Sequence, residues 1–243
     1  MYRRDLAYIH HHGFSEFAES SAPFVIELLW RTGNPACPDR QDCLSSTFVV
    51  EVGCGSGVLA RELTKAGLKV LGFDASPAMI ELARKTAPKA RFEVAPFETA
   101  ELPACDAVIA MGEVLNYGDI RTFLPLAAEA LRPGGLLLFD IAERGSYPDY
   151  DEVRTGGDDW SVIAIKQSDG VKVTRRVFTF REDSRDEELH VLELYERAEV
   201  LSLLEGFRVR IRRSYGKRRL PKGHAAYVCV KRDRAARLQP GAP

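Results

Sequence analysis

An apolar run that meets three glycines at alternate positions constrains this chain more than any other feature. The mainly apolar residues 49–52 lead into Gly53, Gly55 and Gly57, and a helical pattern begins at Val58. Glycine has no Cβ, so such a segment can turn sharply and leave bare backbone for a ligand to approach. The pattern predicts a strand, a glycine-rich turn and a helix with free N–H groups at its start, an arrangement typical of nucleotide-binding α/β sheets.

The spacing of the glycines distinguishes two kinds of ligand. A dinucleotide fingerprint reads G-x-G-x-x-G, and its third glycine would fall on Val58. Glu51, two residues before the first glycine, would repel a pyrophosphate and suits a cationic ligand. We therefore expect Glu51, Gly53, Cys54 and Gly55 to line a binding site. A tight strand–helix turn without any ligand is the alternative.

A second motif follows the next apolar strand, which is predicted over residues 69–74. Asp74 stands at the end of this strand, about 20 residues after Gly53, where an acid can accept the ribose hydroxyl protons of a nucleoside. Ser76 and Pro77 then predict the N-cap and the first residue of a helix. The spacing by itself fits NAD equally well.

Together these motifs resemble the class I S-adenosylmethionine-dependent methyltransferases. Residues 51–57 match motif I of that superfamily, E/D-x-G-x-G-x-G, and residues 74–80 match its D-x-S-x-x-M-I/L segment. Residues 131–140 resemble its entry into the fifth strand, and the likeness covers about residues 47–142. It implies an α/β fold, a Rossmann-like seven-stranded sheet with helices on both faces, and S-adenosyl-L-methionine as cofactor. The cofactor ribose would be held by Asp74, beside Ala75 and Met79.

The resemblance also implies a contact with adenine after the third strand. Many relatives carry an Asp there that bonds the adenine amino group, but Pro96 and Phe97 occupy that position here. Phe97 could flank the adenine, and Glu98 could accept its amino hydrogen. A buried Phe and a solvated Glu are the alternative.

The segment after the fourth strand would lie between cofactor and substrate. Met111 and Gly112 are expected to line the methionine moiety of the cofactor, and Glu113 to lie beside it. Asn116 and Tyr117 are the further polar groups expected near the reacting centre, as weaker candidates for contacts with the substrate. Half-buried packing is the alternative for Tyr117.

Residues 1–46 are predicted to form a helical cap. Their apolar spacing indicates one or two amphipathic helices, and the resemblance implies that these cover the cofactor pocket. Three consecutive histidines stand at positions 10–12, and His11 is a candidate for a substrate contact or a general base at the pocket mouth. A polar helix start is the alternative, and the stretch from Gly33 to Ser46 is expected to be a loop.

The chain changes character over residues 144–195. A polar loop is expected up to Asp159, and alternating segments on both sides of Asp169-Gly170 predict a three-stranded antiparallel insertion between core strands five and six. Methyltransferases of small molecules often carry a substrate-covering addition at this point; a sheet extension or a dimer surface is the alternative. Residues 196–232 predict a helix and a strand pair, and 233–243 a tail, all within a single methyltransferase domain.

Composition excludes several classes of partner. The net charge of -1 gives no reason to expect a nucleic-acid or membrane partner. The basic residues between Arg208 and Lys222 are expected to form a solvated face, and contact with an anionic substrate or a nucleic acid is the alternative. No apolar run approaches the ~18 residues of a membrane span, and no signal peptide is evident, so the expected location is cytoplasmic. Five irregularly spaced cysteines, including the pair Cys37 and Cys43, predict neither a disulfide framework nor a metal site.

We therefore predict an enzyme that moves a methyl group from the cofactor sulfonium to an oxygen or nitrogen, or a carbon, of a small molecule. It would act as a monomer or homodimer. Methyl transfer needs mainly alignment, and a base only where the acceptor must lose a proton, so the sequence identifies no catalytic residue. A non-catalytic S-adenosylmethionine-binding regulatory protein and an NAD(P)-dependent oxidoreductase remain the alternatives, although Glu51 and Val58 count against the latter.

Overall fold

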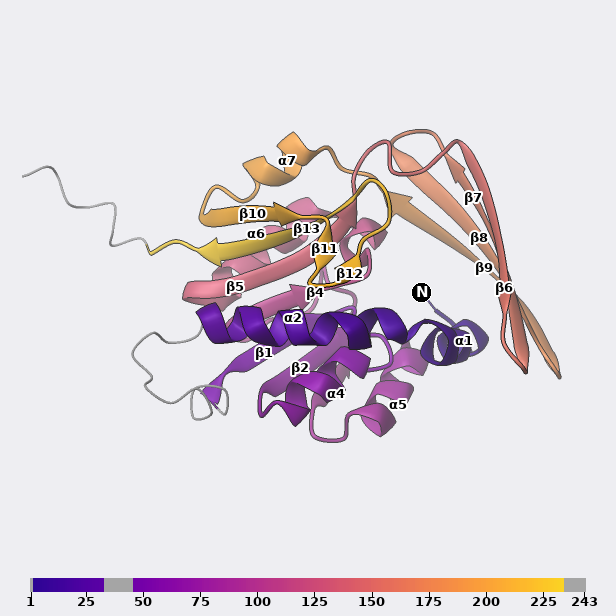
Figure 1. Ribbon diagram of the computed structural model, residues 1–243, viewed down its shortest axis with the longest axis horizontal. Helices are drawn as coiled ribbons and strands as arrows, with labels where there is room; N and C mark the ends of the chain where they lie inside the picture. The colour runs from indigo at the N-terminus through magenta and orange to yellow at the C-terminus, as the bar shows by residue number, and fades with distance from the viewer. Residues whose placement is uncertain (1, 33–45, 234–243) are drawn as a thin grey trace, which may run out of the picture.

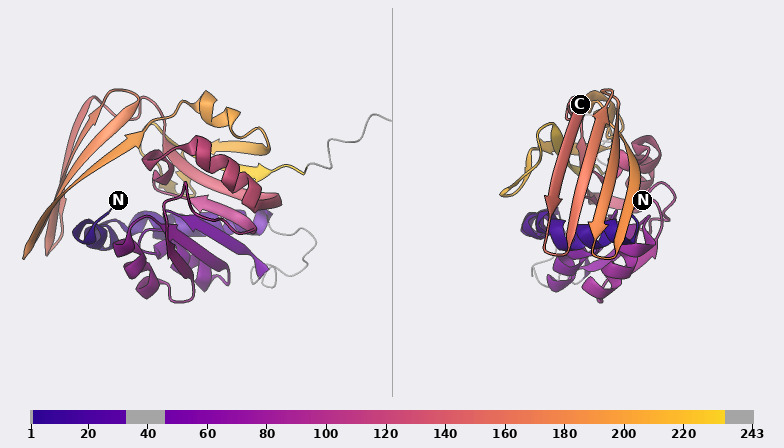
Figure 2. Two further views of the ribbon diagram at one scale, coloured as in Figure 1. Left: turned by 180° about the vertical axis from the view of Figure 1, so that it is seen from behind. Right: turned by 90° about the vertical axis from the view of Figure 1, so that its right-hand side faces the viewer.

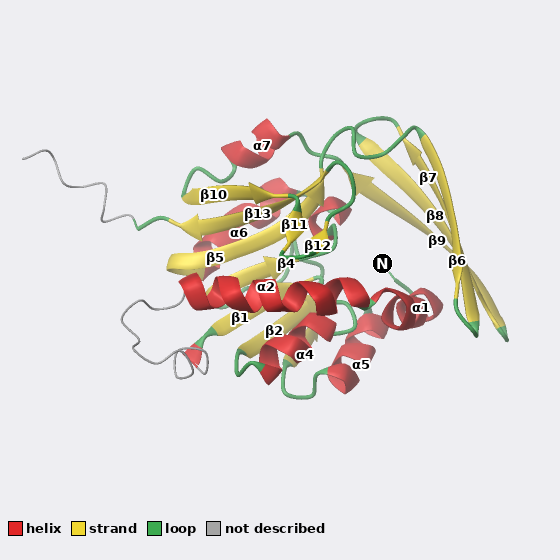
Figure 3. Ribbon diagram, in the orientation of Figure 1, coloured by secondary structure: helices red, strands yellow, loops and turns green. Residues whose placement is uncertain are grey.

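The computed structural model describes residues 2–32 and 46–233 (Figure 1). Its main feature is a twisted seven-stranded sheet, and a four-stranded antiparallel sheet stands at one end of it (Figure 3). In spatial order the seven strands are β10 (Phe207–Arg212), β13 (His224–Lys231), β5 (Leu131–Ala142), β4 (Cys105–Ala110), β1 (Phe48–Val52), β2 (Lys69–Asp74) and β3 (Arg91–Val94).

Strand directions in the large sheet determine where a site can form. Strands β3, β2, β1, β4 and β5 pair in parallel, whereas β13 runs antiparallel to both β5 and β10. The expected seven-stranded methyltransferase sheet is thus confirmed, and β2 has the predicted bounds. Because the strand order reverses direction around β1, the carboxyl ends of β1, β2 and β4 border a crevice in which such folds bind ligands.

Helices cover both faces of this sheet, as the sequence predicted. The helices are α1 (Arg4–Phe14), α2 (Glu16–Thr32), α4 (Val58–Lys65), α5 (Pro77–Thr86), the short 3-10 helix η1 (Val114–Tyr117), α6 (Ile120–Ala130) and α7 (Arg197–Ser202). Apolar residues of α2, α4 and α5 pack on one face, and those of η1, α6 and α7 pack on the other (Figures 1 and 2).

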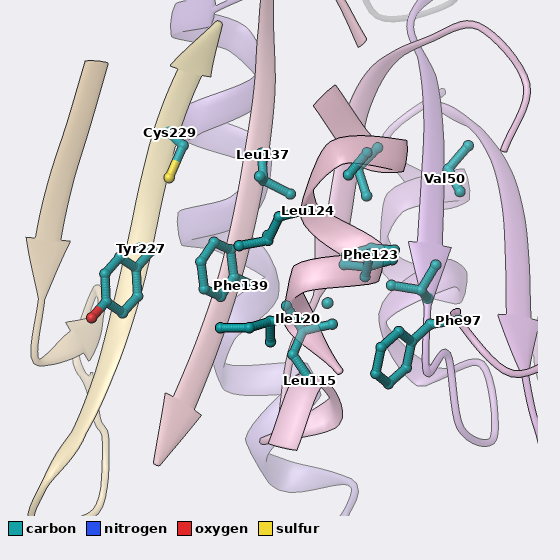
Figure 4. Close-up of a cluster of buried hydrophobic side chains, with 14 of the residues drawn as sticks. Val50, Phe97, Leu115, Ile120, Phe123, Leu124, Leu137, Phe139, Tyr227 and Cys229 are labelled. Carbon is teal, nitrogen blue, oxygen red and sulfur yellow. The ribbon is translucent and has the colours of Figure 1, made fainter. Parts of the chain in front are cut away.

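Aromatic packing fixes the segments that approach the crevice. On α6, Phe123 is fully buried and meets Phe97 edge-on, with ring centroids 5.2 Å apart (Figure 4). On the neighbouring strands, Phe139 of β5 stacks on Tyr227 of β13 at 4.9 Å. Interior side chains pack at the density of organic crystals, so these contacts leave the backbone around Phe97 and Leu115 little freedom to move.

Helix ends follow the predicted signals. The Ser76 hydroxyl accepts a hydrogen bond from Met79 N at 3.1 Å, and Pro77 begins α5, so the predicted N-cap and first residue are confirmed. Gly67 follows α4 with a φ of 95°, the left-handed conformation that favours glycine after a helix. Asp119 caps α6 by accepting from Arg121 N at 3.0 Å.

The insertion after β5 has four strands, not the predicted three. They are β6 (Tyr150–Gly156), β7 (Trp160–Ser168), β8 (Lys172–Arg181) and β9 (Ser184–Glu193), paired antiparallel in chain order (Figure 2). Strand β6 lies in the expected polar loop. Its side chains are mostly exposed, so it has no apolar alternation to reveal it, and pairing with β7 alone makes it a strand.

Smaller corrections concern the ends of the chain. The three histidines lie in the last turns of α1 rather than at a helix start, and the helix predicted at the start of 196–232 is the short α7. A two-stranded hairpin, β11 (Ser214–Tyr215) and β12 (Arg218–Arg219), was not predicted. The expected loop at 33–45, with Cys37 and Cys43, and the tail from 234 lie outside the described residues. None of the described helices is long and apolar enough to cross a membrane.

Candidate active site

A cavity of about 900 Å³ lies at the carboxyl ends of β1, β2 and β4. One part of its lining is the glycine-rich turn and the ends of these strands; another is the face of the four-stranded sheet that turns toward the core. Further lining residues come from α1, from the start of α2 and from the segment between Arg218 and His224, and Figure 1 shows α1 lying between the two sheets. The cavity thus has a half formed by the large sheet and a half formed by the insertion.

The glycine-rich turn brings bare backbone to the cavity. Gly53 and Gly55 have φ angles of 64° and 53°, which side chains rarely tolerate. A Cβ on Gly53 would lie 2.3 Å from the Val114 side chain, so this position requires glycine for space as well. A Cβ on Gly55 would meet nothing within 4 Å, which means that the peptide of Gly55 faces open space.

Asp74 organises the base of the cavity at the end of β2. Its Oδ2 accepts from Gly55 N at 2.9 Å, and its Oδ1 accepts from Ser76 N at 2.8 Å. Burial raises the pKa of this carboxyl group, and the two backbone donors oppose that shift. The carboxylate therefore joins the glycine turn to the start of α5 and still lines the cavity.

Glu51 is a buried acid that lacks a full set of partners. Its side chain lies on β1, the residue is 5% exposed, and its Oε2 has no hydrogen-bond partner. Burial, and then the nearby charge of Asp74, raise the pKa of Glu51 to about 8. Since a buried carboxylate without a partner is costly, this position favours a cationic ligand that would pair with it.

The backbone after β4 is held in an unusual conformation. Glu113 is the only non-glycine residue with positive φ, 61°, in the described part of the chain. Asp140 of β5 fixes this turn, because its carboxylate accepts from Gly112 N at 2.9 Å and from Glu113 N at 3.0 Å. Tyr215 donates its hydroxyl to the same carboxylate at 2.7 Å. The conformation directs Glu113 into the cavity.

A network of polar side chains surrounds Glu113. Tyr147 donates to Glu113 Oε2 at 2.7 Å, Arg175 Nη2 lies 3.3 Å from the same oxygen, and His224 Nε2 lies 3.0 Å from Oε1. Arg175 also donates to the hydroxyls of Tyr117 and Tyr147, at 3.2 and 3.1 Å. These contacts connect the turn after β4 with β8 and β13.

The network controls the charge of Glu113. Burial alone would raise its pKa, but His224, Arg175 and Tyr147 together lower the pKa of Glu113 to about 2. For His224, burial acts in the opposite direction to the contact with Glu113, and the carboxylate outweighs burial so that the pKa of the imidazole is raised. The insertion is therefore joined to the core through an ionised Glu113.

Comparisons with known proteins agree with this geometry. Residues 49–135 match the model of a methyltransferase domain family. Residues 49–135 therefore carry the features of a methyltransferase domain. The matched residues include the glycine-rich turn, Asp74 and the turn after β4, all of which line the cavity.

Individual known proteins resemble this chain over different lengths. A ubiquinone biosynthesis O-methyltransferase of Bradyrhizobium sp. (strain ORS 278) is 32% identical over 108 residues, which are 42% of this chain and 43% of that protein. The chain thus matches less than half the length of this curated relative. A methyltransferase from Clostridium acetobutylicum shares the fold, with a TM-score of 0.78 and 16% identity over 93% of this chain and 98% of that one. The sugar N-methyltransferase KedS8 from Streptoalloteichus sp. has a TM-score of 0.73 and 16% identity over 96% of this chain and 95% of that one.

All twelve residues that the sequence predicted for the cofactor line this one cavity. Glu51 and Asp74 are among them. Phe97 both lines the cavity and packs in the hydrophobic core. The cavity-lining residues among those selected are Glu51, Gly53, Cys54, Gly55, Asp74, Ala75, Met79, Phe97, Glu98, Met111, Gly112, Glu113 and Tyr117.

Two of the weaker candidates for substrate contacts do not line the cavity. Asn116 is fully buried: its amide donates to Ala142 O and Glu193 O and accepts from Ala142 N, so it joins η1 to β5 and β9. His11 turns toward the glycine loop, with Nδ1 2.9 Å from Ser56 Oγ. Its neighbour His10 lines the cavity instead, and burial lowers the pKa of His10 to about 4.

The sequence analysis missed the residues that the insertion and the last strand contribute. Tyr147, Arg175, His190 and His224 all line the cavity. A signal existed for Arg175, because the alternation along β8 places it on the same face as the buried Val173 and Val177. No comparable signal existed for His224, which reaches Glu113 only because β13 pairs with β5.

Proposed function

We propose that this methyltransferase transfers the methyl group of S-adenosylmethionine to an oxygen or nitrogen atom of a small molecule. The observation that carries the proposal is the buried Glu51 carboxyl group, with an unpartnered oxygen, beside the open backbone of Gly55. Both lie in one cavity with Asp74. S-adenosylmethionine brings two cationic groups and a ribose, and this combination of groups complements them.

A different residue of the chain would hold each moiety of the cofactor. Asp74 accepts hydrogen bonds from the ribose, Glu51 pairs with the cationic methionine end, and Phe97 flanks the adenine. When bound, the cofactor supplies an already activated methyl group on its sulfonium. The residues around it then act mainly by alignment and by excluding water, which in well-oriented systems is worth ~7–11 kcal/mol of the barrier.

Support for a small acceptor comes from the second half of the cavity. Val162, Ala164 and Val177 present apolar surface from β7 and β8, and Lys166 pairs with Asp151 at 3.0 Å beside them. Enclosed, mostly apolar cavities with few polar groups are typical sites for small molecules. The printed names of the relatives point the same way, to an O-methyltransferase of ubiquinone biosynthesis and a sugar N-methyltransferase.

A methyl-transfer assay tests the proposal. The purified chain is incubated with S-adenosylmethionine and a panel of catechols, phenols and amino sugars, with tRNA and duplex DNA as further acceptors. Mass spectrometry then follows S-adenosylhomocysteine and the methylated acceptor. We expect turnover of at least one small molecule by the wild type. At limiting cofactor, the rate of methyl transfer by Asp74→Asn should be roughly 10- to 100-fold lower, because hydrogen bonds to a charged group are lost.

Other outcomes would contradict distinct parts of the proposal. Methylation of tRNA or DNA without any small-molecule turnover would contradict the substrate class. Cofactor binding without methylation of any acceptor would favour a non-catalytic regulatory protein. Asp158→Asn, which changes an exposed residue outside the cavity, is the matched control and should behave as the wild type does.

A further inference from the structure

Strand β9 places a histidine in the acceptor half of the cavity. Its side chains alternate between the two faces of the sheet, so Glu188, His190 and Leu192 are buried while Leu189 and Val191 are exposed. His190 is 3% exposed and lines the cavity. The ring is therefore shielded from bulk water in the wall of the part of the cavity that the insertion forms.

The hydrogen bonding of His190 differs from that of the other ionisable groups around it. On the same face of the insertion, Lys166 and Asp151 form an ion pair, and Arg175 is bonded to three side chains. Neither Nδ1 nor Nε2 of His190 has a hydrogen-bond partner. Its contacts are with rings, because Tyr2 and Tyr117 pack edge-on against it with centroids 5.3 and 5.9 Å away.

Glu188 is placed to hold the imidazole. Its Oε1 accepts from Arg3 N at 2.9 Å, and its Oε2 lies 3.3 Å from His190 Nε2 without the geometry of a hydrogen bond. The other charged group facing the ring is Arg175, directly opposite His190 on β8. A carboxylate on one side of a histidine orients the ring and stabilises its protonated form, which leaves the other nitrogen free to act.

A buried polar group without a partner is costly, and clusters of such groups are characteristic of functional sites. The donor that best satisfies an imidazole nitrogen is an O–H or N–H group. The nucleophile of a methyl acceptor carries that group until it is methylated. The same nitrogen could thus recognise the acceptor and take its proton.

We propose that His190 is the general base of the methyl transfer, held in place by Glu188. The inference rests on the proposed function. The acceptor oxygen or nitrogen forms its bond to the methyl carbon, while the methyl–sulfur bond breaks and leaves its electron pair on sulfur as the neutral thioether. The proton of the acceptor moves to His190 Nδ1, and the resulting imidazolium faces the carboxylate of Glu188.

The first test is the pH dependence of kcat for an acceptor identified in the panel. Wild-type kcat should rise with pH, as is general for a transfer that needs a deprotonated base. His190→Gln should lower kcat roughly 100-fold or more and lose that rise, because general-base catalysis contributes about this much. His12→Gln is the matched control, since His12 is exposed on α1 and does not line the cavity.

A second set of measurements separates catalysis from folding. His190→Gln should bind S-adenosylhomocysteine with an affinity within about twofold of the wild type, because residue 190 lies in the half of the cavity formed by the insertion, away from the strand ends that would hold the cofactor. In the wild type, the imidazole resonances of His190 in heteronuclear NMR should shift when the acceptor is added to the S-adenosylhomocysteine complex. Added imidazole should restore part of the kcat of His190→Ala.

The outcomes distinguish this inference from the function on which it rests. Equal kcat and an unchanged pH profile in a folded His190→Gln would overturn the role of His190 and leave the methyltransferase intact. Loss of kcat without loss of the pH-dependent rise, and without rescue by imidazole, would also overturn it. If the wild type methylates none of the acceptors, the proposed function fails and this inference fails with it.

Discussion

At the residue scale, Glu51 has the clearest consequence for ligand binding. The folded chain raises the pKa of this carboxyl group to about 8, chiefly by burial. A cation bound against it would favour the ionised form and lower that pKa again. Binding of the cofactor should therefore be coupled to loss of a proton.

Calorimetry in two buffers measures that proton. At pH 7 the binding enthalpy of S-adenosylmethionine to the wild type should differ between phosphate and Tris, because the released proton is taken up by the buffer. Glu51→Gln should show a smaller difference and weaker binding. The unliganded variant should also be more stable than the wild type, by an amount that grows from about pH 4.5 to about pH 8, since stability is lost as pH rises through a raised pKa. Identical buffer dependence in both proteins would contradict this account of Glu51.

Glu113 shows the opposite effect of its surroundings. Its pKa falls to about 2, below the ordinary value of 4.5, so its contribution to stability is present above pH 4.5 and is lost as pH falls toward 2. Glu113→Gln should lower the free energy of unfolding at pH 7 by about 3 kcal/mol, and by progressively less in acid. Urea unfolding at pH 7 and pH 3 measures this. The exposed Glu205→Gln is the control, and a variant as stable as the wild type at pH 7 would count against the network.

At the scale of elements, η1 depends on one side chain for its attachment. Asn116 joins it to the backbone of β5 and of β9 with three hydrogen bonds in the interior. The sequence analysis expected Asn116 near the substrate, but its amide has both functions, donor and acceptor, occupied by backbone groups. Its role in the structure is to position the turn that carries Glu113.

Asn116→Ala tests that role. Buried backbone groups would be left without partners, so the free energy of unfolding should fall by about 3 kcal/mol while the affinity for S-adenosylhomocysteine stays nearly unchanged. Urea unfolding and calorimetry measure the two quantities. Gln167→Ala, on the exposed face of β7, is the control. Unchanged stability with loss of methyl transfer would instead restore Asn116 as a substrate contact.

How far the sequence predicted the elements depended on how local their signals were. The glycine turn, β2 and the start of α5 are specified by residues within a few positions of one another, and their predictions were confirmed. Strand β6 has largely exposed side chains, so only its pairing with β7 makes it a strand. A partner that lies elsewhere in the chain cannot be found from local periodicity.

The same limit applied to the site. Glu51 and Asp74 come from motifs and Phe97 from its position after the third strand, and their grouping in one cavity could be anticipated from the parallel sheet. The pairing of Glu113 with Arg175 required the insertion to fold back over the strand ends, and its pairing with His224 required β13 to pair with β5. That placement is tertiary and has no local signal in the sequence.

At the scale of the whole molecule, the cavity exists because three parts of the chain meet, and residues between Arg218 and His224 complete its lining. The strand ends form one wall, the four-stranded sheet forms another, and α1 lies between them (Figure 1). Backbone contacts of Arg3 with Glu188 and of Tyr2 with Ser76 hold the N-terminal segment to both parts. Ligand binding should therefore slow the hydrogen exchange of backbone amides in all three parts, although only the strand ends carry the superfamily motifs.

The central claim is that the cavity binds S-adenosylmethionine through the carboxylates at the strand ends. The most direct test is a calorimetric titration of the wild type, Asp74→Asn and the control Asp158→Asn with S-adenosylmethionine, S-adenosylhomocysteine and NADH. The account predicts that the wild type and Asp158→Asn bind the first two ligands and not NADH, and that Asp74→Asn binds them roughly 10- to 100-fold more weakly. Binding of NADH in their place, or equal affinity in Asp74→Asn, would contradict it.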